Sequence, residues 1–253
     1  MACGAVVAGG ALEARAVRMV YRNEREAKLR TYREGRIDEW VRWIRENVPE
    51  DGRVAFAGRA VHVYGGGNTA YLPVLAGREM MGDDYYGFPR GTIEYNYPPR
   101  VYRKRGEEGW RAFGEAYGVT HWVAARTKVI QRMEAMPGLL EEVARFPVTG
   151  HYDIVVFKVK GAKGGRFLEG SGRVEAEPNR LRVRVDGGGR AVIRYNWREG
   201  LVCKTAGAEI KPFEVDENLR FIEVEAGGNE WVEIGYRPHW SGIEANFDGR
   251  FHH

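Results

Sequence analysis

Apolar residues between positions 37 and 160 alternate between helical spacing and short continuous runs. Ile37, Trp40 and Ile44 lie on one face of a helix, because residues three or four apart share a face. Short apolar runs between such segments predict buried strands. The predicted helices are 37–48, 69–75, 107–117 and 127–136, and the predicted strands are 53–57, 119–124, 140–146 and 152–160. We expect Gly118 to act as a C-cap and Thr127 as an N-cap.

This alternation predicts a layered, Rossmann-like α/β domain over residues 37–160. After Gly161 the pattern changes to short segments in which apolar and polar residues alternate strictly, as in Leu181–Val185. Such segments place alternate side chains on opposite faces of a strand. Together with the glycine-rich turns between them, the segments at 181–185, 190–195, 219–225 and 231–236 predict an all-β sandwich domain over residues 166–237.

The two ends of the chain lie outside these predicted domains. Residues 14–36 carry Glu and Arg or Lys three or four apart, which favours an exposed helix, and we assign residues 1–36 to an N-terminal connector helix. Ala2–Leu12 is small and apolar but lacks a basic segment, so it is a weak signal peptide or the last turns of a transmembrane helix. Residues 238–253 form a tail. No run of 18 apolar residues occurs.

Composition narrows the class of protein. With 43% hydrophobic and 29% charged residues, the chain is expected to be globular. The net charge is +4 and the cations are interleaved with acids, so no nucleic-acid partner is expected. Cys3 and Cys203 cannot form a disulfide framework, and we expect Cys203 to be a buried core residue. With only Ser171 and Ser241 and no Gly-x-Ser-x-Gly motif, a serine hydrolase is disfavoured. No histidines have metal-site spacing.

The segment from Tyr64 to Arg103 concentrates glycines, acids, arginines and tyrosines. This mixture is typical of a polar, aromatic-lined surface that could hold a sugar. Acids would accept hydrogen bonds from sugar hydroxyls, tyrosines would stack on the rings, and arginines would pair with phosphate or with the acids. The candidate ligand-binding residues are His62, Asn68, Arg78, Glu79, Asp83, Asp84, Tyr85, Tyr86, Glu94, Tyr95, Asn96 and Arg100.

Each of these motifs also has a purely structural interpretation. Gly65–Gly67 is an anion cradle or a flexible turn, and the turn is favoured because neither a full dinucleotide motif nor a P-loop is present. The acids are more typical of a solvated loop, which is the favoured interpretation, and the tyrosines are equally typical of a long loop that needs anchoring. No cofactor is expected, with a divalent cation at Glu79, Asp83 and Asp84 as an alternative.

Several strings resemble the extracytoplasmic domains of bacterial membrane proteins of the YfhO-like and GT-C glycosyltransferase-like type. They are Glu39–Ile44, Pro49–Val54, Leu72–Glu79 and Tyr117–Val123. The resemblance covers residues 37–160, and the β part only by general pattern. It implies an accessory module that recognises a glycan or a sugar-phosphate lipid on the periplasmic or extracellular face of the membrane. The catalytic acid of GT-C enzymes lies between transmembrane helices that this sequence lacks, so no catalytic residue is carried over.

The interpretation is therefore a non-catalytic glycan-recognition module whose partner is the transmembrane portion of a parent protein. One alternative is a free-standing, cytoplasmic carbohydrate-active enzyme, with Glu79 and one of Asp83, Asp84 or Glu94 as acid and base. A further alternative is a structural scaffold for protein contacts.

Overall fold

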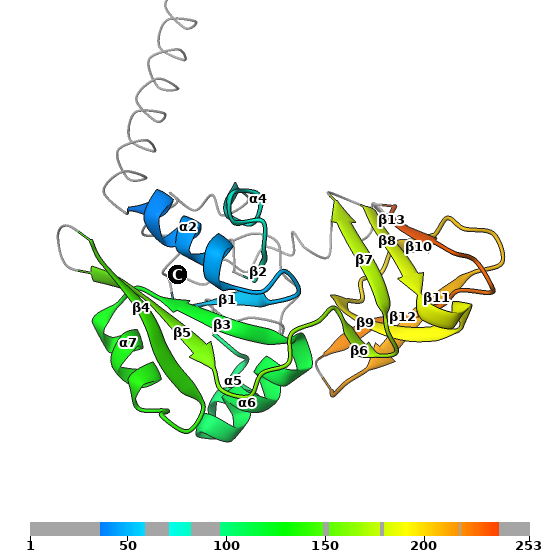
Figure 1. The fold of residues 1–253 in the computed structure, drawn as a ribbon. Coiled ribbons are helices and arrows are strands. Elements are labelled where there is room, and N and C mark those ends of the chain that lie inside the picture. Colours follow the sequence, from blue (N-terminus) through cyan, green and yellow to red (C-terminus); the bar gives the residue numbers. More distant parts are fainter. Residues whose placement is uncertain are drawn as a thin grey trace, which may run out of the picture.

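The computed structural model describes most of the chain between residues 36 and 237 (Figure 1). It has mixed α/β content, with one five-stranded sheet and two four-stranded sheets in this part. We call residues 36–160 the α/β region and residues 166–237 the β region. The described residues are 36–58, 71–81, 97–148, 152–177, 180–217 and 219–237.

The α/β region is built on the five-stranded sheet. Its strands are β1 (Arg53–Ala57), β2 (Glu79–Met81), β3 (Val119–Ala124), β4 (Leu140–Val148) and β5 (Tyr152–Val159). They lie in the order β2-β1-β3-β5-β4. β1 pairs in parallel with β2 and β3, whereas β5 pairs antiparallel with β3 and β4. Three neighbouring strands therefore point the same way, and their carboxyl ends share one edge.

Helices cover both faces of this sheet (Figure 1). One face carries α2 (Ile37–Asn47) and α4 (Tyr71–Ala76), and the other carries α5 (Arg100–Arg103), α6 (Gly106–Tyr117) and α7 (Thr127–Glu134). In β1, Val54 and Phe56 pack with α2, while Ala55 and Ala57 pack in the cluster of α6 and α7. Because both faces are buried, the strand reads as a continuous apolar run.

The β region consists of two four-stranded antiparallel sheets. Its elements are β6 (Phe167–Glu169), β7 (Gly172–Glu177), β8 (Arg180–Val185), η1 (Asp186–Gly188), β9 (Arg190–Asn196), β10 (Leu201–Cys203), β11 (Glu209–Glu214), β12 (Arg220–Glu225) and β13 (Val232–Tyr236). The strand orders are β10-β13-β8-β7 and β11-β12-β9-β6. One hydrophobic cluster joins both sheets, with Val183 and Ile234 from the first and Ile193 and Ile222 from the second. Alternate residues of each strand therefore face a shared core.

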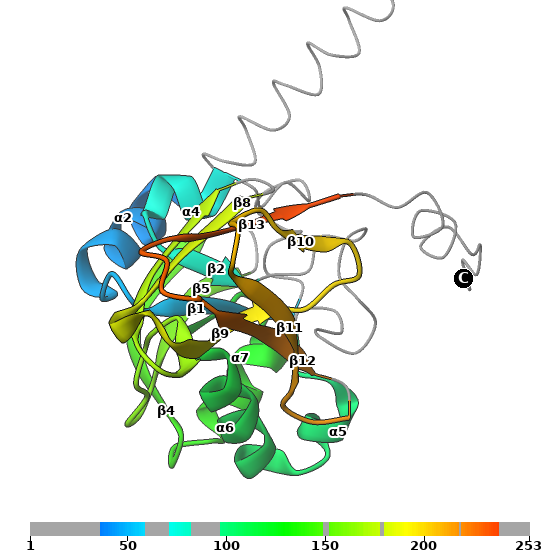
Figure 2. The same ribbon diagram turned by 90° about the vertical axis from the view of Figure 1, so that its right-hand side faces the viewer.

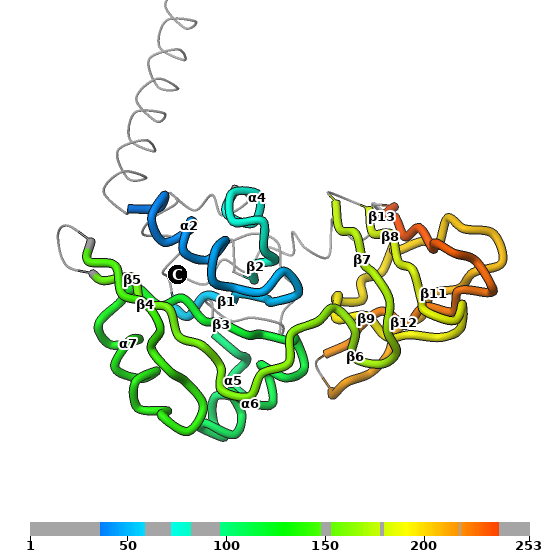
Figure 3. Tube along the Cα trace, in the orientation of Figure 1, coloured from blue at the N-terminus to red at the C-terminus, as the bar shows by residue number. Residues whose placement is uncertain are grey.

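The two regions are in direct contact. The chain passes from β5 through residues 160–166 into β6 (Figure 3). The largest cluster of the α/β region also contains Leu219 and Phe221 of the β region, and the rings of Tyr117 and Phe221 meet edge to face at 5.2 Å. The Tyr102 hydroxyl donates a hydrogen bond to Asp216. The packed side chains of Tyr117 and Phe221 therefore join α6 to β12, two elements that lie next to each other in Figure 2.

Most elements expected from the hydrophobic pattern are confirmed. The strands at 53–57 and 119–124 are β1 and β3, and Gly118 ends α6 with φ of 66°, as a C-cap glycine does. The expectation for Thr127 is wrong, because Arg126 has the extended N-cap conformation and Thr127 is the first helical residue. Cys203 is half-buried beside the core of the β region and not fully buried as expected.

Other elements are absent from the sequence-based prediction, namely β2, α5, β6, β7, β10 and β11. Three of these strands have three residues each, and β11 contains Pro212, which is typical of an edge strand. The expected tail and all but the last residue of the expected connector helix lie outside the described residues. No helix in the described part of the chain is both long and apolar enough to cross a membrane.

Candidate functional site

Three of the twelve candidate ligand-binding residues, Arg78, Glu79 and Arg100, lie in the described part of the chain. Arg100 is exposed at the start of α5. The remaining candidates lie outside the described residues, namely His62, Asn68, Asp83, Asp84, Tyr85, Tyr86, Glu94, Tyr95 and Asn96. Their roles stay predictions.

The guanidinium of Arg78 binds backbone carbonyls at the C-terminal end of α2. Its Nε donates to the carbonyl of Val48 at 2.7 Å, and its Nη2 donates to the carbonyl of Arg45 at 2.8 Å. Its Nη1 donates to the carbonyl of Gly77 at 2.8 Å. The last carbonyls of a helix have no partner within the helix, and a cation near them is favourable. These contacts of Arg78 stabilise the C-terminal end of α2.

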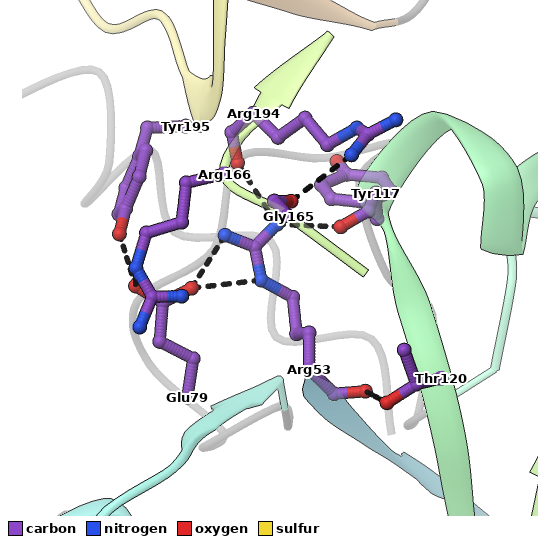
Figure 4. A network of polar contacts seen from close by, with 8 residues as sticks. All are labelled: Arg53, Glu79, Tyr117, Thr120, Gly165, Arg166, Arg194 and Tyr195. Carbon is purple, nitrogen blue, oxygen red and sulfur yellow. Dashed lines mark hydrogen bonds and ion pairs between the residues drawn. The ribbon is translucent and has the colours of Figure 1, made fainter. Parts of the chain in front are cut away.

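Glu79 joins the two regions through a network of polar contacts (Figure 4). Its Oε2 accepts hydrogen bonds from Nε and Nη2 of Arg53, at 3.0 and 2.6 Å. Its Oε1 accepts a hydrogen bond from the Tyr195 hydroxyl and lies 3.2 Å from Nε of Arg166. Since Arg166 and Tyr195 belong to the β region, this one carboxylate holds side chains from both regions.

Arg53 lies at the centre of this network and is 5% exposed. Its Nη1 donates to the carbonyl of Tyr117 at 2.7 Å and to the carbonyl of Arg194 at 3.0 Å. A buried charge is costly unless it is paired and its hydrogen bonds are satisfied, and here Glu79 and two carbonyls do both. The sequence pattern did not indicate Arg53 and Tyr195, because their partners lie 26 to 141 residues away along the chain.

The environment of Glu79 favours its ionised form. Burial raises its pKa, but the charges of Arg53 and Arg166 outweigh burial, and the net pKa lies below the usual value. Burial and the Glu79 charge raise the pKa of Tyr195. A general acid needs a pKa near the working pH, and the surroundings of Glu79 shift its pKa the opposite way.

The Glu79 network lies at the amino edge of the parallel strands, because Arg53 and Glu79 begin β1 and β2. The chain leaves β1 after Ala57 and β2 after Met81, which is the carboxyl edge. It continues there into residues 59–70 and 82–96, which contain the nine candidates outside the described residues. Open α/β sheets bind ligands at the carboxyl ends of their strands. The carboxyl edge is therefore a second candidate location for a site.

Tyr97 is the centre of a group of described side chains at this edge. The guanidinium carbons of Arg103 and Arg132 lie 5.6 and 5.7 Å from the centroid of its ring. A Cβ atom at Gly58 would lie 2.9 Å from the Tyr97 hydroxyl, so the glycine, with φ of 68°, allows the tyrosine to approach the end of β1. We call Gly58, Tyr97, Arg103 and Arg132 the Tyr97 cluster.

The two sequence segments that supply Tyr97, Arg103 and Arg132 are rich in basic residues. Residues 97–105 and 126–132 contain seven Arg and Lys residues and no Asp or Glu. These two segments are separate in the sequence but meet at Tyr97, because Arg103 is the last residue of α5 and Arg132 lies on α7. The absence of acids from both segments is the sequence signal that could have identified this surface. The cations are Arg100, Arg103, Lys104, Arg105, Arg126, Lys128 and Arg132.

No group of three or more His, Cys, Asp or Glu side chains is placed to hold a metal ion within the residues that the structure describes. Glu79 is the only described member of the three acids named for a divalent cation, and its oxygens already bind Arg53, Arg166 and Tyr195.

In comparisons with known proteins, no family model matches the chain, and no curated protein or solved structure matches it significantly. Function is therefore inferred from the geometry of the chain itself.

Proposed function

We propose that the protein is a non-catalytic recognition module for an anionic glycan, such as a sugar joined to a lipid through phosphate. The proposed binding surface is the carboxyl edge of the five-stranded sheet. The observation that carries the proposal is the Tyr97 cluster, in which one aromatic ring holds two arginines within a segment pair that has no acid.

The arrangement favours a phosphate group. Arginine offers a planar fork of donors that matches phosphate oxygens, and charge-assisted hydrogen bonds are the strong ones. Arg103 and Arg132 both lie against the ring of Tyr97, which brings two guanidinium groups to one part of the carboxyl edge. Tyr97 acts as a positioning residue, because both of its described cation contacts are to the arginines. The candidate residues of 82–96 would contact the sugar.

The pKa of Glu79 favours recognition over catalysis. The enzyme alternative uses Glu79 as acid or base, but a carboxylate paired with two arginines is a poor proton donor at neutral pH. The scaffold alternative leaves the two arginines of the Tyr97 cluster without a role.

The proposal extends to the architecture. We propose that residues 37–160 form a Rossmann-like α/β domain and residues 166–237 a β-sandwich domain. The parallel β2-β1-β3 unit with helices on both faces supports the first, and the core shared by two antiparallel sheets supports the second. In this proposal the module belongs to the extracytoplasmic face of a bacterial membrane, where its partner is the transmembrane portion of a GT-C-like protein.

The test is binding to neutral lipid vesicles with and without a polyprenyl-phosphate sugar, measured by co-sedimentation. The protein should bind only the vesicles that carry the phosphosugar. The double change Arg103→Gln and Arg132→Gln should weaken binding at least about tenfold, because two charge-assisted contacts are lost. Arg42→Gln is the matched control, since Arg42 is exposed on α2 at the opposite face of the sheet. Equal binding by the double variant would refute the site.

A further inference from the structure

A cavity of about 350 Å³ lies where the two regions meet, at the amino edge of the sheet. Its walls come from α6, the start of β3, residues 159–163 and β9. The side chains that matter for its chemistry are Arg111, Glu115, Val119, Lys160, Lys163 and Arg194. The Tyr97 cluster lies at the carboxyl edge and contributes none of these residues.

Arg194 is the least satisfied charge of this cavity. Its Nη1 donates to the carbonyl of Gly165 at 3.0 Å, but its buried Nε has no hydrogen-bond partner among the described residues. No carboxylate in the described part of the chain forms an ion pair with it, and burial followed by the charge of Arg53 lowers its pKa. A partly buried cation of this kind gains from an anionic ligand.

The backbone around Arg194 is shaped to hold its side chain. A Cβ atom at Gly118 would lie 3.0 Å from Nη1 and 3.3 Å from Cδ of Arg194. Gly118 also has φ of 66°, so a side chain there would be disfavoured on two grounds. The guanidinium is therefore held against the end of α6 and does not extend freely into solvent.

The remaining charges of the lining are mostly positive. Arg111 is balanced by Glu107, at 3.1 Å, and also donates to the carbonyl of Gly138. Lys160 donates to the carbonyl of Pro137 at 2.9 Å, and Lys163 is exposed.

With Arg111 balanced, the three cations Lys160, Lys163 and Arg194 face the single acid Glu115, which leaves an excess of two positive charges. The C-terminal end of α6 offsets about half a charge of this excess.

We propose that this cavity binds a phosphorylated small molecule of about the size of a sugar phosphate. A phosphate monoester carries a charge of about −1.5 to −2 at neutral pH, which matches the excess charge of the lining. The cavity volume lies at the lower end of the range of about 300–1,000 Å³ that small-molecule sites occupy. Arg194 and Lys163 bind the phosphate, and the apolar wall at Val119 contacts the remainder of the ligand.

The experiment is calorimetric titration of the full chain with a hexose monophosphate, with the unphosphorylated hexose and inorganic phosphate as comparison ligands. The hexose monophosphate should bind, and the hexose should not. Arg194→Gln should weaken binding more than about tenfold and Lys163→Gln about fivefold, since each removes one charged donor. Lys163 is exposed, so its variant should fold even if Arg194→Gln does not.

Two controls distinguish binding in this cavity from binding elsewhere on the protein. Arg237→Gln removes an exposed arginine of the β region outside the cavity, and it should leave the affinity unchanged. The Arg103→Gln and Arg132→Gln double variant removes the binding surface proposed at the carboxyl edge. Hexose monophosphate that this variant still binds is therefore bound in the cavity.

Three results would overturn the proposal. The first is no binding at about 10 mM hexose monophosphate, a concentration that would saturate even a weak specific site. The second is an equal loss of affinity in Arg237→Gln and Lys163→Gln, which would indicate general attraction to a basic protein. The third is loss of binding in the Arg103 and Arg132 double variant alone, which would place the phosphate at the carboxyl edge.

Discussion

At the scale of single residues, Arg53 shows how a buried charge is satisfied by groups from distant parts of the chain. It donates to Glu79, to the carbonyl of Tyr117 and to the carbonyl of Arg194, which belong to β2, α6 and β9. The sequence pointed to Glu79 as a candidate carboxylate, because it lies in the segment from Tyr64 to Arg103, where glycines, acids, arginines and tyrosines are concentrated. It could not identify the partners, since periodicity relates only residues that are close along the chain.

His121 is the residue whose titration should be visible in the stability of the protein. It is 3% exposed, its Nδ1 lies 2.9 Å from Thr120 Oγ1, and its ring meets Trp43 edge to face. Burial, followed by the charge of Lys158 on the neighbouring strand, lowers the pKa of His121 to about 4.

The folded protein therefore binds this proton less readily than the unfolded chain, in which the histidine pKa is about 6.5. Its contribution to stability is complete above pH of about 6.5 and is lost as the pH falls toward about 4. We expect the free energy of unfolding to drop by up to about 3 kcal/mol across this window. Urea unfolding at several pH values measures the drop.

In His121→Phe, the free energy of unfolding should change less with pH between about 6.5 and 5. Carboxylates such as Glu79 do not yet titrate in this range. A variant with the same slope as the natural protein would contradict the assignment.

At the scale of elements, α6 contains two glycines that differ in whether a side chain could be accommodated in their place. A Cβ atom at Gly109 would lie 1.8 Å from the carbonyl oxygen of Tyr102, where α5 meets α6. A Cβ atom at Gly114 would meet nothing within 4 Å. The sequence predicts this helix from its apolar spacing, but the contact that decides between the two glycines comes from α5, a four-residue helix absent from that prediction.

We expect Gly109→Ala to lower the free energy of unfolding by about 2–3 kcal/mol, because the backbone carbonyl of Tyr102 must move to admit the methyl group. Gly114→Ala should raise it by about 0.5–1 kcal/mol, since alanine is the better helix former and the site has space. Thermal or urea unfolding of the two variants measures both effects. The same sign for both changes would show that α5 does not pack on α6 as described.

The long, periodic elements were predictable and the short ones were not. Helix α2 carries apolar residues at helical spacing, and strands β1 and β3 are mostly apolar runs, so a local pattern indicates all three. β2 has three residues, and its place in the sheet comes from pairing with β1, which no local pattern encodes. The Tyr97 cluster was missed for the same reason, since Arg103 and Arg132 meet only through the packing of α5 and α7 around one ring.

At the scale of the whole molecule, the two regions share a hydrophobic cluster. Phe221 of β12 is fully buried and meets the ring of Tyr117 at the end of α6. Leu219 lies in the same cluster and is 4% exposed. Separating the regions would expose this apolar surface to water, which is costly, and would break the contacts of Glu79 with Arg166 and Tyr195. The regions should therefore unfold as one cooperative unit.

Phe221→Ala tests this coupling. We expect the free energy of unfolding to fall by about 3–5 kcal/mol, because a large buried ring is lost from a packed interface. Amide hydrogen exchange should report a similar loss of protection in β3 and in β9, which belong to different regions. Val74→Ala is the control, since Val74 is 81% exposed and its truncation should change stability by less than about 0.5 kcal/mol. Reduced protection confined to the β region would mean that the regions open separately.

The three-way pairing of Glu79 also constrains how this protein can diverge. Neutralising the carboxylate leaves Arg53 and Arg166 facing each other and the Tyr195 hydroxyl without its acceptor, so the loss of Glu79 alone is harmful to the fold. We therefore expect substitutions at Arg53, Glu79 and Tyr195 to occur together in related sequences. A distant homologue with little remaining sequence similarity should therefore be recognisable by three residues. These are an arginine at the start of one strand, an acid at the start of the neighbouring strand and a tyrosine in a later antiparallel sheet.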